Sequence, residues 1–295
     1  MVDRPLPTSG DQEFTQIRYR IQQRIAHVTL ACPQSANALS MTMRLELVAA
    51  LRRAQSDEKV RVVVLDGDGS TFCSGYDLGA PYGSSADRAA RPGWISDRSL
   101  RKWTDPFARS CLDDWLVAWD LLKPIVAVVQ GNCLGGGTEL MSFADIVFAA
   151  DDARIGYPPV RAMSTPDVPV LAWKMTMARA KYLQLTGNSV DGKTAAEWGW
   201  IAKSFPAAEL QEHAWNEAEA LSSVDAGLLA ANKHQVNQAY EIMGLRTHLA
   251  QAWMWHYLSS TARPDGNAFF DQVKDVGMKE ALTWMNGPFN QRGLI

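Results

Sequence analysis

Glu139 and the three glycines that precede it, Gly135, Gly136 and Gly137, are the residues of this sequence best suited by type and spacing to chemistry. Three successive glycines favour a turn in which the backbone approaches another group closely or takes a positive φ. Where such a turn opens a helix, unpaired N–H groups and the positive end of the helix dipole can stabilise an oxygen acquiring negative charge. Glu139 would lie beside those donors. A tight turn with a capping acid explains the same residues equally well.

A second glycine turn lies in the stretch FCSGYDL at residues 72–78. Gly75 marks a bend there, and Tyr76 and Asp77 follow where a second backbone N–H can point into a cleft shared with Gly136. Each turn alone is a weak signal. Two such turns, each after a buried strand and separated by one segment, favour a common site.

Phosphate-binding loops do not fit the glycine stretch. Cys133 stands two residues after Gly131, where the dinucleotide fingerprint needs glycine, and no Lys-Ser or Lys-Thr pair follows Gly137. The glycine stretch therefore matches neither of the two nucleotide-binding loops, and phosphate binding is not expected there.

The elements that must hold these turns follow from hydrophobic periodicity and from turn residues. A β-branched run precedes the glycines, helix formers follow them, and a second apolar run closes the unit. We predict strands at 124–130, 146–149 and 60–65, a hairpin within 14–31, and helices at 42–55, 107–122, 138–143, 209–221, 226–243 and 246–258. Prolines in 151–169 predict an irregular segment.

Residues 79–105 predict a long mobile loop or lid, because loops of this length tend to be functional. Its cations, Arg88, Arg91, Arg98, Arg101 and Lys102, suit either an anionic ligand or a solvated face.

Four tryptophans lie in and after this loop, at positions 94, 103, 115 and 119. They can line a substrate pocket, although for the two in the predicted helix a place in the core is the commoner outcome.

Length and composition indicate one large globular domain or a domain with an appendage. The chain has 295 residues, 47% of them hydrophobic, and a net charge of -3 with a pI near 6.0. This balance argues against a general nucleic-acid surface. No apolar run is long enough to span a membrane, and the first residues lack a signal-peptide core. We expect a cytoplasmic protein with no membrane partner.

The cysteines and histidines predict neither a disulfide framework nor a metal centre. Cys32, Cys73, Cys111 and Cys133 are widely separated, with no Cys-x-x-Cys pair and no histidine at zinc spacing. None of the five histidines lies near the glycine stretch in sequence, so a Ser-His or Cys-His nucleophile is not indicated, unless folding brings one close.

Taken together, the motifs resemble the crotonase superfamily of enoyl-CoA hydratases and isomerases. The resemblance runs from about Ile17 to Phe289, and its most specific pieces lie at 72–78, 123–140 and 143–159. It implies an α/β fold, a spiral of ββα turns with a helical C-terminal region. The expected organisation is a flexible arm at 1–13, a core that binds acyl-CoA at 14–206, and helices that mediate oligomerisation at 207–295.

The resemblance also implies an acyl-CoA thioester substrate, enolate chemistry, no cofactor besides the CoA of the substrate, and a homotrimer or homohexamer. By position, the N–H groups of Tyr76 and Gly136 form the oxyanion hole and Glu139 is the first catalytic glutamate. CoA and substrate binding falls to Asn37, Ala38, Leu39, Ser74, Gly75, Asp77 and Gly135.

The sequence departs from the hydratase pattern at Pro159, which occupies the position of the second catalytic glutamate. Eight residues later, Asp167 matches the place where dienoyl-CoA isomerases and 4-chlorobenzoyl-CoA dehalogenases put a catalytic aspartate. We predict that Asp167 replaces the missing glutamate, so that Glu139 and Asp167 form the acid–base pair. Asp167 also precedes an apolar helical run, where aspartate is a favoured N-cap.

Three hypotheses about function remain open from the sequence. The first is hydration or double-bond isomerisation of an enoyl-CoA. The second is a crotonase-fold hydrolase or dehalogenase that uses Asp167, and the third is a non-catalytic member that binds a ligand such as RNA. The glycines and Glu139 favour the first two, and the acidic pI weighs against RNA.

Overall fold

A six-stranded sheet, built from the β-branched runs of the sequence, organises the chain. The computed structural model describes residues 14–79, 83–91, 93–97, 99–100, 104–263 and 268–293. The predicted hairpin is confirmed: β1 (Ile17–Gln22) pairs antiparallel with β2 (Ile25–Leu30) through a turn in which Gln23 has a φ of 53°.

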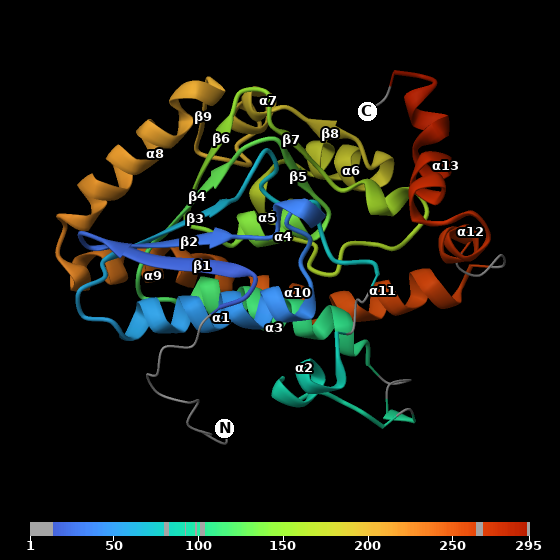
Figure 1. Ribbon diagram of the computed structural model, residues 1–295, viewed down its shortest axis with the longest axis horizontal. Coiled ribbons are helices and arrows are strands. Elements are labelled where there is room, and N and C mark those ends of the chain that lie inside the picture. The colour runs from blue at the N-terminus through green and yellow to red at the C-terminus, as the bar shows by residue number, and fades with distance from the viewer. Residues whose placement is uncertain are drawn as a thin grey trace.

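Four further strands extend this hairpin in parallel. They are β3 (Val62–Gly67), β4 (Ile125–Val129), β6 (Ile146–Ala150) and β9 (Lys203–Phe205), and the order across the sheet is β1-β2-β3-β4-β6-β9. Every residue of β2, β3 and β4 is buried. Their near-continuous apolar sequences are explained by this burial on both faces, since helices cover the sheet on either side (Figure 1).

A second, smaller layer of strands gives the fold its spiral. It comprises β5 (Asn132–Leu134), β7 (Arg154–Gly156) and β8 (Ser189–Val190), and a bridge between Cys73 and Cys133 continues it toward the preceding turn of the chain. The chain thus passes repeatedly from a strand of the large sheet to the small layer and then to a helix. This is the expected spiral of ββα turns.

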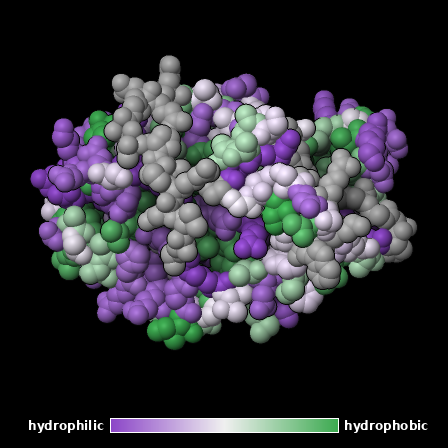
Figure 2. All heavy atoms as spheres, turned by 90° about the horizontal axis from the view of Figure 1, so that it is seen from below, coloured by the Kyte–Doolittle hydropathy of each residue, from purple (hydrophilic) through white to green (hydrophobic). Residues whose placement is uncertain are grey.

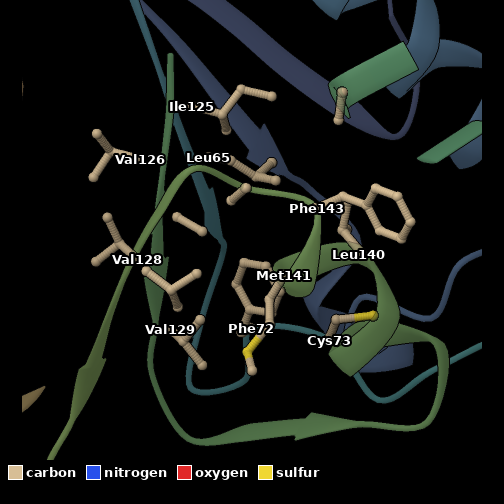
Figure 3. Close-up of a cluster of buried hydrophobic side chains, with 14 of the residues drawn as sticks. Leu65, Phe72, Cys73, Ile125, Val126, Val128, Val129, Leu140, Met141 and Phe143 are labelled. Carbon is tan, nitrogen blue, oxygen red and sulfur yellow. The ribbon is translucent and has the colours of Figure 1, made fainter. Parts of the chain in front are cut away.

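Helices close the spiral, and polar side chains cap the first turns of α1 and α3. Ser40 caps α1 (Met41–Ser56) by accepting from the Met43 N–H, and Asp105 caps α3 (Pro106–Asp120). The glycine stretch opens the short buried α4 (Gly136–Ser142). Figure 3 shows Leu140 and Met141 of this helix packed with Phe72 and the strand residue Val129.

The remaining helices are short between 151 and 206 and longer beyond. They are α2 (Ser85–Ala90), α5 (Leu171–Lys174), α6 (Met177–Thr186), α7 (Gly192–Glu197), α8 (Ala207–Ser222), α9 (Ala226–Ile242), α10 (Leu245–Ala250), α11 (Ala252–Thr261), α12 (Ala268–Val276) and α13 (Met278–Asn290). Helix α8 packs on the sheet, where it contacts β3, β4 and β6, whereas α11 lies against α3 (Figure 1).

A partly buried ion pair fixes α9 to the body of the protein. The ammonium of Lys233 lies 2.9 Å from Asp145 Oδ2 and also donates to the carbonyl of Ala118. Burial raises the pKa of Asp145, and the charge of Lys233 opposes this shift. Truncating Lys233 would leave the partly buried carboxylate of Asp145 without its cation, which is unfavourable. The pair therefore holds the C-terminal helices in place.

The structure corrects three expectations about the elements. The helix predicted at 246–258 is two helices, α10 and α11, and the segment predicted as irregular at 151–169 contains β7. Residues 79–105 are not one long loop, because a capping box at Ser84 and Asp87 starts α2 within them. The predicted arm at 1–13 lies outside the described residues, and the division at 206 stays a prediction. Within the described parts of the chain, no helix is both long and apolar enough to cross a membrane.

Candidate active site

Two backbone N–H groups face the predicted oxyanion position without an acceptor of their own. Tyr76 forms a parallel bridge with Leu39 in which Leu39 donates to the Gly75 carbonyl and accepts from the Asp77 N–H, so the N–H of Tyr76 points away from this pairing. Gly136 is the first residue of α4, where an N–H has no intrahelical acceptor. Neither group has a hydrogen-bond partner among the described residues.

Glycine is required along this turn for reasons of space and of backbone conformation. Gly135 has a φ of 53°, in the left-handed region, and Gly75 has a φ of 108°. A Cβ at Gly136 would lie 2.6 Å from the ring of Tyr76, and one at Gly137 would lie 2.9 Å from Cys73 Cβ. The glycines therefore let the turn at 75–76 approach the start of α4 closely, which brings the two N–H groups together.

Glu139 is buried one turn into α4 and is held by three partners. Its Oε2 accepts a 2.6 Å hydrogen bond from the Tyr76 hydroxyl, and its Oε1 accepts from the Val168 N–H at 3.1 Å. The side chain of Tyr157 also hydrogen bonds to it. Burial, and after it the charge of Asp167, raises the pKa of Glu139 to about 8. The carboxyl is then largely protonated at neutral pH and can donate a proton.

Asp167 lies beside Glu139 and has a lower pKa. It is only 5% exposed, and burial raises its pKa to about 6 against the opposing charge of His256. Hydrogen bonding with Tyr157 lowers the pKa of both carboxyl groups, so this tyrosine joins the two acids. The predicted pair thus comes together as two carboxyl groups with separated pKa values, which is the pattern of an acid and a base.

Asp167 does not cap a helix. The N-cap of α5 is Val170, and that helix has no side-chain cap. Asp167 Oδ1 has no hydrogen-bond partner in the described part of the chain and lies 3.4 Å from His256 Nε2. The carboxyl of Asp167 therefore does not serve as the helix cap that the sequence allowed.

His256 reaches the site from α11, far along the chain. Its Nδ1 lies 2.6 Å from Asp105 Oδ2, so its ring stands between two aspartates. Burial disfavours a charge on this ring, but the hydrogen bond to Asp105 and the charges of Asp167 and Asp105 outweigh it and raise the pKa of His256 to about 9. Nothing in the sequence except its residue type distinguishes this histidine as part of the site.

A buried cationic cluster supports the other side of the site. Arg44 is fully buried, donates to Asp114 and Ser110, and lies 5.5 Å from the Tyr76 ring centroid. Arg91 makes two hydrogen bonds to the same Asp114. One carboxylate therefore neutralises only part of two guanidinium charges, and Arg44 lowers the pKa of Asp167 through its charge.

The two alternatives for the loop cations, an anionic ligand or a solvated face, are both wrong for Arg91, which is buried against Asp114. Arg88 donates to the Gly83 carbonyl, whereas Arg98, Arg101 and Lys102 lie outside the described residues.

The tryptophans separate in the same way. Trp115 is 1% exposed and donates to the Tyr76 hydroxyl at 3.1 Å, so it belongs to the core and supports Tyr76 from there. Trp119 donates to Glu241 and packs on Phe143. Trp94 is half-buried, and Trp103 lies outside the described chain.

The residues predicted to bind CoA form a structural unit next to the oxyanion turn. Segments 36–39 and 74–77 hydrogen bond to each other, with the Ser74 N–H donating to the Ala36 carbonyl. Asn37 is fully buried. Its side-chain oxygen accepts from the Cys32 N–H, and its side-chain nitrogen donates to the carbonyls of Asp68 and Thr71. Its contribution to ligand binding is therefore to hold this turn. Ser74 is exposed, Ala38 and Asp77 are half-buried, and Leu39 is buried.

A cavity of about 800 Å³ lies elsewhere, along β1 and β2. It is lined by Arg20, His27 and Asp66 among others and shares no lining residue with the groups around Glu139. We place the site at Glu139 despite this cavity, because acids with raised pKa values and unpaired N–H groups converge there. Across the residues that the structure describes, no group of three or more His, Cys, Asp or Glu side chains could hold a metal ion.

Comparison with known proteins identifies relatives over nearly the whole chain. The model of the enoyl-CoA hydratase/isomerase family matches residues 20–271. A probable enoyl-CoA hydratase of Rhodobacter capsulatus is 33% identical over 75% of this chain and 80% of its own, and a probable mitochondrial enoyl-CoA hydratase of Dictyostelium discoideum is 29% identical over 89% and 88%. The crystal structure of an enoyl-CoA hydratase/isomerase from Xanthobacter autotrophicus Py2 superposes with a TM-score of 0.82 at 30% identity, covering 94% of this chain and 99% of that one.

Proposed function

This chain belongs to the enoyl-CoA hydratase/isomerase family, and we propose on that premise that it hydrates or isomerises an enoyl-CoA thioester, with Glu139 and Asp167 as its acid and base. One observation carries the proposal. The unpaired N–H groups of Tyr76 and Gly136 lie beside two buried carboxyl groups whose pKa values differ. Donors of this kind stabilise the oxyanion of an enolate, and each is worth about 10²–10³ in rate.

The difference in pKa assigns the two roles. Near pH 7 Asp167 is mostly ionised and Glu139 mostly protonated. In a hydration, Asp167 would accept a proton from water while the water oxygen bonds to the β carbon, and Glu139 would give its proton to the α carbon. The two carboxyl groups then exchange a proton before the next turnover. Tyr157, which hydrogen bonds to both, offers a path for that exchange.

A panel of CoA thioesters tests this assignment. Glu139→Gln and Asp167→Asn should each lower kcat by roughly 10²–10⁴, the usual worth of a positioned acid or base. Glu209→Gln, at an exposed position of α8, is the matched control and should keep full activity. Mass spectrometry separates addition of water from a double-bond shift, which leaves the mass unchanged. Turnover unaffected by both active-site variants would refute the assignment.

The oxyanion hole needs a test that spares the neighbouring side chain, because a Cβ at Gly136 meets the Tyr76 ring at 2.6 Å. In a Tyr76→Ala background, Gly136→Pro removes the N–H and Gly136→Ala retains it. We expect a folded proline variant to lose at least about 10²-fold in kcat relative to the alanine variant. Equal rates would show that this N–H contributes nothing.

Hydrolysis of an acyl-CoA or a haloacyl-CoA is the second candidate function. Two observations favour it: Pro159 stands where hydratases have a second glutamate, and Asp167 Oδ1 is free to act as nucleophile or base. Release of free CoA thiol or of halide from the same panel distinguishes this reaction from hydration. RNA binding by a non-catalytic member is the third, and salt-dependent retention on RNA would be its sign.

The substrate and the assembly are also part of the proposal. We expect a bulky or aromatic acyl group, because four tryptophans lie within residues 94–119 and one of them, Trp94, is only half-buried. The CoA moiety of the substrate would be the only cofactor. A homotrimer or homohexamer is supported by exposed apolar side chains on the C-terminal helices, where Leu228 is 55% exposed and Trp255 is 64% exposed. A cytoplasmic location stays a prediction.

A further inference from the structure

A carboxylate, an imidazole and a second carboxylate form a line that ends at the candidate base. Asp105 Oδ2 lies 2.6 Å from His256 Nδ1, and His256 Nε2 lies 3.4 Å from Asp167 Oδ1. The side chains of Asp105, His256 and Asp167 are 15%, 17% and 5% exposed, so the line runs inward from a partly solvated edge. The three residues come from the N-cap of α3, from α11 and from the segment before α5.

The positions of the two aspartates, one hydrogen bonded to Nδ1 and the other 3.4 Å from Nε2, favour a doubly protonated ring. A neutral imidazole carries a single N–H and can donate to only one of the two aspartates, whereas an imidazolium presents an N–H to each. Asp167 Oδ1 has no other partner among the described residues, and Asp105 uses its Oδ1 to cap α3. Both carboxyl groups therefore have an oxygen available to a cationic ring.

We propose that His256 is a positioning residue whose imidazolium holds Asp167 ionised, so that Asp167 accepts the proton and Glu139 donates it. This inference rests on the proposed function for its catalytic meaning, but the charge relation can be measured without any substrate. The assignment of roles depends on it, because burial favours the neutral form of both carboxyl groups and His256 lowers the pKa of Asp167 more than Arg44 does.

Other charged and titratable groups around the line are few, and their effects are known in direction. His256 faces Asp105, Asp167 and Glu139. Apart from His256, Asp167 experiences Asp105, which raises its pKa, and Arg44, which lowers it, together with the hydrogen bond from Tyr157. The charge of Asp167 in turn raises the pKa of Glu139. His256 is thus the cation that α11 contributes to a site otherwise built from residues 44–168.

The pH dependence of kcat/KM in His256→Gln tests the proposal. Glutamine keeps a hydrogen-bond donor but removes the charge, so the pKa of Asp167 should rise and the acidic limb of the profile should move upward by about one to three pH units. His256→Lys restores a cation and should move the limb back. His248→Gln is the matched control on α10: its ring pairs with Trp173 instead of an active-site acid, and the limb should not move.

Asp105→Asn provides an independent change at the outer end. Asparagine is as good an N-cap as aspartate, so α3 should keep its cap. The ring of His256 loses its charged partner, and its pKa should fall from about 9. Histidine NMR in the free protein follows this directly: we expect the ring of His256 to titrate near pH 9 in the original protein and at lower pH in the variant.

The outcomes separate this inference from the proposed function. An unchanged acidic limb in His256→Gln, with only a lower melting temperature, would reduce His256 to a helix anchor and overturn the inference. If no CoA thioester reacts at all, the proposed function fails and the NMR titration decides alone. A His256 ring that is neutral below pH 7 in the free protein would then overturn the inference as well.

Discussion

The hydroxyl of Tyr76 donates a 2.6 Å hydrogen bond to Glu139 Oε2, while the N–H of the same tyrosine has no acceptor among the described residues. One residue thus serves both parts of the site: its backbone faces the predicted oxyanion and its side chain orients the acid. The Tyr76 hydroxyl also accepts from Trp115 Nε1 at 3.1 Å, which fixes the ring.

Removing this hydroxyl should shift the alkaline side of the activity profile. The hydrogen bond stabilises the ionised form of Glu139 and so lowers its pKa. In Tyr76→Phe the pKa of Glu139 should therefore rise, and the alkaline limb of kcat/KM should move to higher pH. Tyr182→Phe, at an exposed tyrosine of α6, controls for loss of a hydroxyl elsewhere. A limb that moves downward, or not at all, would contradict the role of Tyr76.

Activity in the unaltered enzyme should be bell-shaped. Asp167 must be ionised and Glu139 protonated, so kcat/KM should rise through about pH 6 and fall through about pH 8. A rate measured from pH 5 to 10 with a saturable thioester tests this. Activity that still increases at pH 9 would mean that Glu139 works in its ionised form.

The stability of the protein should depend on pH through Glu139. The pKa of Glu139 is raised from its ordinary value of 4.5, expected in the unfolded chain, to about 8 in the folded protein. Its contribution to the free energy of unfolding is therefore fully present below pH 4.5 and is lost as pH rises through 8. Glu139→Gln cannot ionise. We therefore expect its melting temperature to fall less than that of the original protein between pH 6 and 9. Parallel thermal shifts in both proteins would argue against a raised pKa.

The buried cluster around Asp114 predicts an unequal pair of mutations. Asp114→Asn leaves the charges of Arg44 and Arg91 without a buried anion and should destabilise the protein by about 3–5 kcal/mol. Arg44→Met leaves one arginine paired with Asp114 and should cost less. Urea unfolding measures both. If Arg44→Met proved the more damaging, the packing of Arg44 against the rings of Tyr76 and Phe107 would outweigh its charge.

Self-association should depend on the apolar surface of the C-terminal helices. On the face shown in Figure 2, apolar residues form separate patches among polar ones, whereas α9 exposes Leu228, Val236 and Ile242. Light scattering at micromolar concentration should show a trimer or hexamer that a Leu228→Glu, Val236→Glu variant weakens. Ile21→Glu on β1 is the control at an exposed apolar position elsewhere. A monomer at that concentration would refute the assembly.

The sequence sufficed for the parts of the site that lie close together in the chain. Gly135 to Gly137 and Gly75 can be recognised because a positive φ and a close backbone approach both demand glycine. Glu139 follows from its place in the first turn of a helix. Strands β3 and β4 were predictable because their apolar runs are buried on both faces.

Other residues of the site could not be predicted because their roles depend on contacts between segments far apart in the chain. His256 is half-buried on a helix whose pattern does not distinguish it from a surface histidine, and only tertiary packing brings it to Asp167. Tyr157 follows a glycine in an irregular segment, and nothing local points its side chain at two acids. For Arg91 the sequence left a ligand and a solvated face open, because its partner, Asp114, lies on the next helix and cannot be paired with it from sequence.

The row of side chains Asp105, His256 and Asp167 is completed late, because His256 is synthesised long after the other two residues. The ribosome completes the oxyanion turns, Glu139 and Asp167 well before it adds His256. At 5–20 residues per second, the stretch between residues 167 and 256 takes on the order of ten seconds. During that interval the nascent site holds two acids and no imidazolium. On the proposed assignment, the difference in charge between Asp167 and Glu139 is therefore established only when the C-terminal helices dock.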